Sequence, residues 1–162
     1  MNKEKEFLLQ IKKFIVEANK KGYAAGGAAR IKKEKDHSKT ISYVRGDWKY
    51  HDNYFGGEPY GGREVVFFKG KPVWMMTYYG WVNGGVELEP VYSFLQEALR
   101  AIPENNPYRG PKLHENDSVN MIYHNIWGGD AAQFSGEERI MQGKKEVYRA
   151  MYMGGLVDVV RQ

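Results

Sequence analysis

The sequence of 162 residues contains no cysteine. Disulfide bonds, thiol nucleophiles and zinc sites built from thiolates are therefore excluded. It also lacks a run of about 18 apolar residues, the length that a membrane-spanning helix needs. Its charged start, residues 1–5, differs from a signal peptide, in which an apolar segment follows a short basic one. We therefore expect a soluble, cytoplasmic protein with no membrane partner.

Motifs for catalysis and cofactor binding are also missing. No Gly-x-Ser-x-Gly turn is present to expose a serine nucleophile. The glycines of residues 22–27 follow a predicted helix, whereas a phosphate-binding loop precedes one. The four histidines are not spaced with acidic residues as metal ligands usually are. We predict no catalytic residue, no metal and no cofactor, and we favour a non-enzymatic protein.

Positive charge is concentrated near the N-terminus. Residues 1–39 hold eleven Lys and Arg against five Asp and Glu, in a chain whose net charge is +4. Because these lysines and glutamates alternate along a predicted helix, the pattern is typical of a solvated helix face. The charge excess is modest for a nucleic-acid-binding domain, so nucleic acid is not a favoured partner.

Two segments have apolar residues at helical spacing. Residues 3–20 carry an apolar stripe opposite lysines and glutamates, and residues 90–102 run from a proline suited to the first turn to the stop at Pro103. Residues 23–40 between the first helix and the strands have no period and little bulk. We expect a mobile basic loop there, either a plain connector or a lid in which Arg30, Lys32 and Lys33 close over an anion.

Strand patterns occupy two stretches. Alternation and turn residues predict strands at 47–55, 64–69 and 72–79, and a second set at 119–127, 136–142 and 146–153. The two sets resemble each other over about residues 47–82 and 120–156, an internal repeat that places Glu64 on Glu137. The matched aromatic strands are Trp48, Tyr50, His51, Asp52 and Tyr54 with Met121, Tyr123, His124, Asn125 and Trp127.

These elements predict an α+β fold in a single domain over residues 1–162, since 42% of the residues are hydrophobic and the length suits one core. We expect two pseudo-duplicated halves, each a helix followed by three strands. Their strands would share one strongly curved antiparallel sheet of about six strands.

An acid or an amide lies among aromatic residues in each set of strands. Asp52 falls between Tyr50 and Tyr54, and Asn125 between Tyr123 and Trp127. A buried carboxylate needs a hydrogen bond or a cavity, because burying it unpaired costs several kcal/mol. Either a tyrosine hydroxyl or a backbone amide satisfies Asp52 inside a filled core, or aromatic walls hold a planar ligand whose polar edge meets Asp52 and Asn125.

The candidate ligand-binding residues follow from that second interpretation and from the repeat. Arg149 is included because a charge in mid-strand needs either a carboxylate or a ligand anion as its partner. The full set is Trp48, Tyr50, Asp52, Tyr54, Glu64, Trp74, Tyr78, Tyr123, Asn125, Trp127 and Arg149.

Several short motifs, in order along nearly the whole chain, resemble domain of unknown function 5680. They are Gly22-Tyr-Ala-Ala-Gly-Gly, Tyr54-Phe-Gly-Gly, Gly70-Lys-Pro-Val-Trp-Met-Met-x-Tyr-Tyr-Gly, Pro107-Tyr-Arg-Gly-Pro and Gly154-Gly-Leu-Val. Members of that family occur alone or behind helix-turn-helix regulators of the Xre type, so the resemblance implies a sensing or partner-binding module. It carries over no catalytic residue. The N-terminus here offers one helix instead of a DNA-reading bundle, and direct operator binding is not implied.

Three functions follow from these observations. The leading hypothesis is a non-enzymatic domain that binds, senses or sequesters a small planar or anionic ligand, such as a nucleotide-like molecule. The second is a protein-interaction module, an inhibitor or adaptor, with Trp81, Tyr60 or Trp127 as aromatic anchors. The third is an acid–base enzyme that uses Asp52, Glu64 or the histidines.

Overall fold

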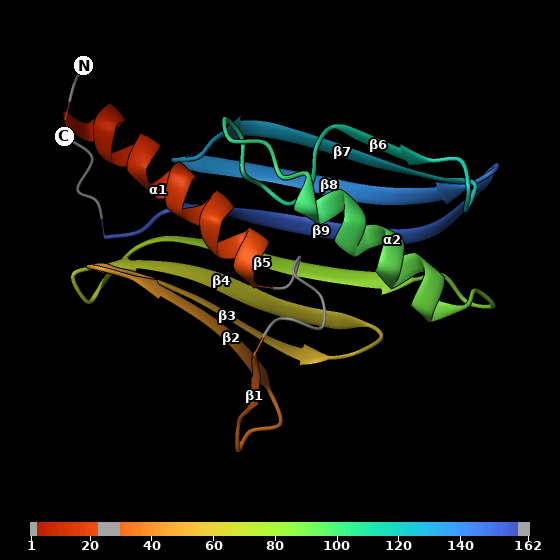
Figure 1. Ribbon diagram of the computed structural model, residues 1–162, viewed down its shortest axis with the longest axis horizontal. Helices are drawn as coiled ribbons and strands as arrows, with labels where there is room; N and C mark the ends of the chain where they lie inside the picture. The colour runs from red at the N-terminus through yellow and green to blue at the C-terminus, as the bar shows by residue number, and fades with distance from the viewer. Residues whose placement is uncertain (1–2, 23–29, 159–162) are drawn as a thin grey trace.

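The computed structural model describes residues 3–22 and 30–158, which form two helices and nine strands (Figure 1). Both helices begin and end close to the predicted positions. In chain order the elements are α1 (Lys3–Lys21), β1 (Ile31–Lys33), β2 (Lys39–Arg45), β3 (Trp48–Gly56), β4 (Tyr60–Phe68), β5 (Lys71–Val82), α2 (Leu88–Arg100), β6 (Leu113–Asn116), β7 (Met121–Asp130), β8 (Gln133–Gln142) and β9 (Lys145–Leu156). Neither helix of the described residues has the length and apolar character needed to cross a membrane.

All nine described strands pair in one antiparallel sheet of order β1-β2-β3-β4-β5-β9-β8-β7-β6. Two runs of hairpins, β1 to β5 and β6 to β9, meet where β5 pairs with β9, so the last strand lies at the centre. Short turns join the neighbours in each run. At the β4–β5 turn, for example, Lys69 and Gly70 both have positive φ, the conformation that a two-residue hairpin turn requires.

The prediction of a six-stranded sheet made from two helix-plus-three-strand halves is wrong. Three further strands, β1, β2 and β6, belong to the sheet: the sequence has strand character from Ile41, within β2, but β1 and β6 lie in segments where it showed no clear strand pattern. The β1 and β6 strands form the two edges of the sheet, and their side chains are exposed or half-buried. An edge strand with little buried surface needs no apolar alternation, and its backbone pairing leaves no trace in the sequence.

The basic segment between the first helix and the strands also contains regular structure. Residues 31–33 are β1, and β2 begins at Lys39. Lys32 and Lys33 are therefore strand residues, and Lys32 pairs with Glu34 across 2.9 Å on the surface. Residues 23–29 of the predicted loop lie outside the described residues.

The register of β7 and β8 corrects the alignment of the proposed repeat. The structure pairs Asp52 with Glu64 across β3 and β4, and it pairs Asn125 with Glu138 across β7 and β8. Glu138 is fully buried, whereas Glu137, one residue earlier, faces the other side of the sheet. A shift of one residue along a strand moves a side chain to the opposite face.

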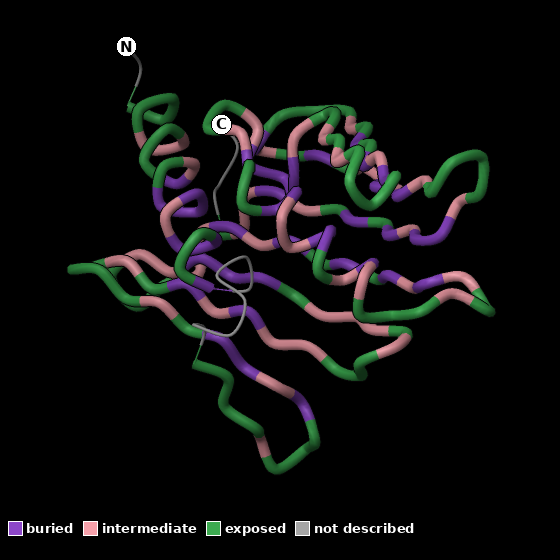
Figure 2. Tube along the Cα trace, turned by 45° about the vertical axis from the view of Figure 1, so that its right-hand side comes forward, coloured by how far each residue is buried: buried purple, intermediate pink, exposed green. Residues whose placement is uncertain are grey.

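Both helices lie across the same face of the sheet (Figure 1), and buried residues alternate with exposed ones along the strands beneath them (Figure 2). One apolar cluster joins α1 to β3, β4 and β5 and reaches Tyr108, Phe134 and Tyr152; the other joins α2 to β7, β8 and β9. Tyr60 packs against both clusters. The region between them is where polar side chains are buried.

The opposite face of the sheet carries no helix among the described elements (Figure 1). Its strands expose large apolar side chains, because side chains along a strand alternate between the two faces. The most exposed are Val44, Tyr79, Ile126, Met151 and Met153.

Candidate functional site

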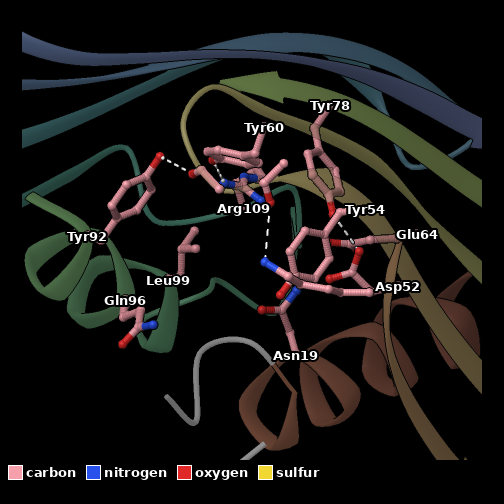
Figure 3. Close-up of a pocket in the computed structure, with 13 residues that line it drawn as sticks. Asn19, Asp52, Tyr54, Tyr60, Glu64, Tyr78, Tyr92, Gln96, Leu99 and Arg109 are labelled. Carbon is pink, nitrogen blue, oxygen red and sulfur yellow. Dashed lines mark hydrogen bonds between the residues drawn. The ribbon is translucent and has the colours of Figure 1, made fainter. Parts of the chain in front are cut away.

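A cavity of about 280 Å³ lies between α1, α2 and the sheet, where the two apolar clusters meet (Figure 3). Strands β2 to β5 form its floor, both helices contribute to its walls, and the segment between α2 and β6 closes one side. The residues that line it are Asn19, Lys39, Asp52, Tyr54, Gly56, Gly57, Tyr60, Glu64, Tyr78, Tyr92, Gln96, Leu99 and Arg109.

Two carboxyl groups lie side by side on the sheet. Asp52 on β3 pairs directly with Glu64 on β4, so both side chains project from the same face, toward the helices. Asp52 is 4% exposed and Glu64 is 3% exposed. Figure 3 shows their carboxyl groups next to each other at the wall of the cavity. Two neighbouring acids that are both removed from water are costly to ionise together.

The hydroxyl of Tyr78 supports Asp52. It donates a hydrogen bond of 2.5 Å to Asp52 Oδ1 from β5, two strands away. Gly62 on the intervening strand makes this reach possible, since a Cβ atom there would lie 2.7 Å from the Tyr78 hydroxyl and 2.5 Å from the carbonyl oxygen of Asn53. The glycine therefore positions the tyrosine that holds Asp52.

Glu64 is less fully satisfied. The Tyr50 hydroxyl interacts with it by a hydrogen bond, but Glu64 Oε2 is buried and has no hydrogen-bond partner among residues 3–22 and 30–158. A buried polar atom without a partner usually costs about 1–3 kcal/mol. Such an atom beside a cavity is a common feature of a site that is completed by another molecule.

Burial shifts the acidity of both groups. Removal from water, together with the neighbouring Asp52 carboxylate, raises the pKa of Glu64 to about 8 against the opposing effect of the Arg109 cation. Burial likewise raises the pKa of Asp52 to about 6, although the Tyr78 hydrogen bond and Arg109 lower it. At neutral pH the pair therefore holds one proton, on Glu64, and one negative charge, on Asp52.

A second buried acid, Glu138, lies on β8 beyond the cavity. Arg109 Nε and Nη2 donate to Glu138 Oε1 across 2.9 and 2.6 Å, and the hydroxyls of Tyr123 and Tyr148 also donate to this carboxylate. Arg109 is 6% exposed, adopts a positive φ of 74° and lies over the ring of Tyr78. Its backbone strain is offset by these contacts, which fix the guanidinium beside the cavity.

Of the predicted ligand-binding residues, the structure brings Asp52, Tyr54, Glu64 and Tyr78 to the cavity. Tyr50 lies directly beneath them, buried and next to Glu64. These residues come from three adjacent strands, β3, β4 and β5, and alternation along β3 correctly placed Tyr50, Asp52 and Tyr54 on one face.

Other predicted residues belong to the core. Trp48 stacks on Phe7 near the start of α1, and Trp74 is fully buried and donates to the carbonyl oxygen of Ala131. Tyr123 supports Glu138, as described above. Trp127 packs edge-on against Tyr108.

Two polar residues of the predicted set are satisfied by the protein. The side-chain amide of Asn125 donates to the carbonyl oxygens of Tyr108 and Gly110, and its oxygen accepts from Tyr152. Arg149 pairs with Glu146 on the open face of the sheet, across 2.9 Å. Asn125 and Arg149 do not line the cavity.

The three residues proposed as a lid, Arg30, Lys32 and Lys33, do not line the cavity either, and each is exposed. The cation that does so from this part of the chain is Lys39, at the start of β2. Its Nζ lies 5.6 Å from the centre of the Tyr54 ring and 3.5 Å from the carbonyl oxygen of Gly56.

Sequence reasoning missed Arg109, Tyr92, Gln96, Leu99 and Asn19. The two helices were predicted, but helical spacing does not say which turn borders a cavity. Arg109 lies in Pro107-Tyr-Arg-Gly-Pro, a segment assigned to a polar connector. The tyrosine and the arginine between its two prolines were the available signal, because both side chains can carry a polar tip into a buried region while their stems pack on apolar surface.

The chemical capacity of the site follows from these groups. Four tyrosine rings, Tyr54, Tyr60, Tyr78 and Tyr92, offer flat apolar surfaces, and the acid pair offers acceptors for N–H or O–H donors. Within the described part of the chain, no three His, Asp or Glu side chains are grouped to hold a metal ion. The cavity is therefore suited to a small organic molecule with a donor at one end.

Comparison with protein families identifies the family of this chain. The family described as "Domain of unknown function (DUF5680)" matches residues 52–157, which include the acid pair, both central strands and Arg109. No curated protein matches the chain. No solved structure matches it either.

The burial of Glu138 predicts a large effect of replacing its partner. Arg109→Met should destabilise the protein by about 3–5 kcal/mol, because it leaves a fully buried carboxylate without its cation. Arg149→Met is the matched control: its ion pair with Glu146 is partly exposed, and its loss should cost less than about 1 kcal/mol. Urea unfolding of both variants measures the difference, and equal losses would contradict the assignment.

The raised pKa of Glu64 predicts a dependence of stability on pH. The folded protein keeps a proton that the unfolded chain loses above a pKa of 4.5, so the free energy of unfolding should fall as pH rises from 4.5 toward about 8. The slope from this group is at most about 1.4 kcal/mol per pH unit. Asp52, whose folded pKa is also raised, adds a fall of the same sign at lower pH, between 3.8 and about 6.

Glu64→Gln cannot ionise, so its stability should fall less over this range than that of the wild type. Glu137→Gln, on the open face, should keep the wild-type slope. Urea unfolding at several pH values between about 5 and 8 tests this. Parallel curves for the wild type and Glu64→Gln would show that Glu64 has an ordinary pKa.

Proposed function

The chain belongs to the DUF5680 family, and we propose that it is a non-enzymatic domain that binds a small molecule in the cavity between α1, α2 and the sheet. The observation that carries this proposal is the buried carboxyl pair of Asp52 and Glu64 at the cavity wall, with Glu64 Oε2 unpartnered among the described residues. A ligand that donates to this pair removes the cost of leaving a buried oxygen without a hydrogen bond.

The surroundings of the pair support binding over simple imperfect packing. Tyr54, Tyr60 and Tyr92 border the cavity from two strands and a helix, and flat rings favour contact with a planar body. The volume of about 280 Å³ lies at the small end of the range for ligand sites. A molecule of one or two rings fits these limits, whereas a whole nucleotide is a poorer fit.

The negative charge of the acid pair at the cavity wall argues against the anionic ligand that was one of the hypotheses from the sequence. The Asp52–Glu64 pair carries at least one negative charge at neutral pH, since the pKa of Asp52 is about 6. An anion would be repelled at this end, and of the two cations that line the cavity Arg109 is already paired with Glu138, which leaves Lys39 beside Tyr54 to attract it. We therefore propose a ligand whose polar end is neutral or positive.

Acid–base chemistry is the second candidate. Burial separates the two acids, with the pKa of Asp52 raised to about 6 and that of Glu64 raised to about 8, so one is a base and the other an acid near neutral pH. Pairs with separated pKa values are frequent in active sites. Turnover of a bound compound that is lost in Asp52→Asn, while binding persists, would favour this candidate.

The protein-interaction alternative has separate support on the open face of the sheet. Tyr79, Ile126, Met151 and Met153 are each more than half exposed there, and soluble monomers rarely expose a large contiguous apolar patch. This face lies on the other side of the sheet from the cavity, because Tyr78 and Tyr79 point in opposite directions. The two functions are therefore compatible in one domain.

A metabolite panel tests the proposed function by melting temperature and by ¹H–¹⁵N spectra. A true ligand at a hundredfold its dissociation constant should add about 2.7 kcal/mol to the free energy of unfolding. Its spectral changes should centre on residues that border the cavity, such as Tyr54, Glu64 and Leu99.

A cavity-filling variant provides the control. Leu99→Phe places a larger side chain in the cavity and should abolish the ligand-dependent stabilisation, each variant being compared with its own ligand-free baseline. Leu88→Phe changes an exposed residue of the same helix and should leave binding intact. The proposal fails if no compound in a broad panel perturbs the cavity, or if Leu99→Phe binds as well as Leu88→Phe.

A further inference from the structure

Two carboxyl sites of similar construction lie on the face of the sheet that the helices cover. In each, an Asp or Asn pairs across the strands with a Glu, Asp52 with Glu64 and Asn125 with Glu138. In each, a tyrosine from further along the sheet donates to the first member: Tyr78 to Asp52 across 2.5 Å and Tyr152 to Asn125 across 2.6 Å.

The glutamates have matching tyrosine partners as well. The Tyr123 hydroxyl donates to Glu138 Oε2 across 2.5 Å, and Tyr50 hydrogen-bonds Glu64. The two glycines are also alike, since a Cβ atom on Gly62 or on Gly136 would lie within 2.7 Å of the hydroxyl of the tyrosine opposite. The polar side chains that the sheet itself supplies are therefore nearly the same at both sites.

The sites differ in what completes them. At Glu138 the protein supplies a planar cation, the guanidinium of Arg109, through two hydrogen bonds of 2.9 and 2.6 Å. The Tyr148 hydroxyl adds a further donor at 2.9 Å. At this site, therefore, the group that pairs with the buried glutamate is a planar cation.

Nothing in the described chain fills the corresponding place at Glu64. Arg109 lies near enough to lower the pKa of Glu64, but its hydrogen bonds go to Glu138 and to the Tyr60 hydroxyl. Lys39, the other cation at the cavity, lies over Tyr54 and contacts the Gly56 carbonyl oxygen. In the described residues no cationic side chain hydrogen-bonds Asp52 or Glu64, and the cavity occupies the space in front of them (Figure 3).

We infer that the cavity binds a ligand with a planar cationic head, an amidinium or guanidinium group, which donates N–H bonds to Glu64 and Asp52. The inference rests on the proposed function and names its ligand class. The fork of donors on such a head matches a carboxylate geometrically, as Arg109 does at Glu138. The rings of Tyr54, Tyr60 and Tyr92 then contact the body of the ligand and add cation–π attraction.

Binding of this cation is linked to a proton. Glu64 is protonated in the free protein at neutral pH, because burial and Asp52 raise its pKa to about 8, and the ligand favours its ionised form. Affinity should therefore rise by up to about tenfold per pH unit below pH 8 and level off above it.

The charged and titratable groups that face Glu64 from the surrounding elements are Asp52, Tyr50, Tyr78, Tyr54, Tyr60, Tyr92, Lys39, Arg109 and Glu138. The pKa of each of the tyrosines Tyr50, Tyr54, Tyr60 and Tyr78 is raised by burial, so these hydroxyls stay neutral over this range.

Benzamidine, benzamide and benzoate test the inference, because they share one ring and differ in the charge of a planar head. Calorimetry or ¹H–¹⁵N titration at about pH 8 should show benzamidine binding at least about tenfold more tightly than benzamide, with no binding of benzoate. The spectral changes should lie at Asp52, Glu64 and Tyr78.

Variants identify the group responsible. Glu64→Gln keeps the shape of the side chain and should weaken benzamidine at least about tenfold while removing the pH dependence. Asp52→Asn should also weaken it, and Asn125 shows that an amide is accommodated at the matching position. Glu137→Gln, on the open face, should bind benzamidine as the wild type does.

Benzamide or benzoate binding as tightly as benzamidine would overturn the assignment of a cationic head, and so would unchanged affinity in Glu64→Gln. No perturbation of the cavity by benzamidine at millimolar concentration would overturn it as well. The proposed function survives each of these results, because it is tested separately by the wider metabolite panel and by the comparison of Leu99→Phe with Leu88→Phe.

Discussion

The pairing of β3 with β4 places two carboxyl groups directly opposite each other under the helices, and the rest of the site depends on this contact. Both Asp52 and Glu64 are almost fully buried. Two adjacent acids cannot both ionise cheaply away from water. The Tyr78 and Tyr50 hydroxyls and the nearby Arg109 charge stabilise one negative charge, and the cavity leaves room for a molecule that would stabilise a second.

The same sheet contains a completed version of this arrangement. Glu138 is as buried as Glu64, yet it accepts from Arg109, Tyr123 and Tyr148. This contrast argues that the missing partner of Glu64 is not merely imperfect packing. The same sheet supplies a complete set of hydrogen-bond partners to a buried glutamate a few strands away. Sites that keep an unsatisfied group at a stability cost are commonly functional ones.

Sequence reasoning predicted the two helices, the α+β character and the unusual position of Asp52, because helical spacing and strand alternation are strong local signals. It placed Asp52, Tyr54, Glu64 and Tyr78 in one candidate site, and the structure brings these four to the cavity. It did not find the edge strands β1 and β6. Their exposed side chains have no periodic pattern, and their pairing is made by the backbone.

The cation near the acid pair also escaped prediction. Arg109 reaches the cavity from a connector, and its importance depends on tertiary contacts to β8 that no local pattern encodes. Glu138 was missed because the repeat, as aligned from the sequence, matched Glu64 to Glu137, one residue before the position that the strand pairing gives. In a strand that error exchanges a surface residue for a buried one. Local patterns located the acids; the cations and the exact register required the folded chain.

The most direct test of this account is a pH titration of the side-chain carboxyl carbons of Glu64 and Asp52 in the ligand-free protein by ¹³C NMR. The account predicts that Glu64 titrates at about pH 8 and Asp52 at about pH 6. Titration of both groups near their ordinary values of 4.5 and 3.8 would show that the pair is already solvated or paired, and would contradict the central claim.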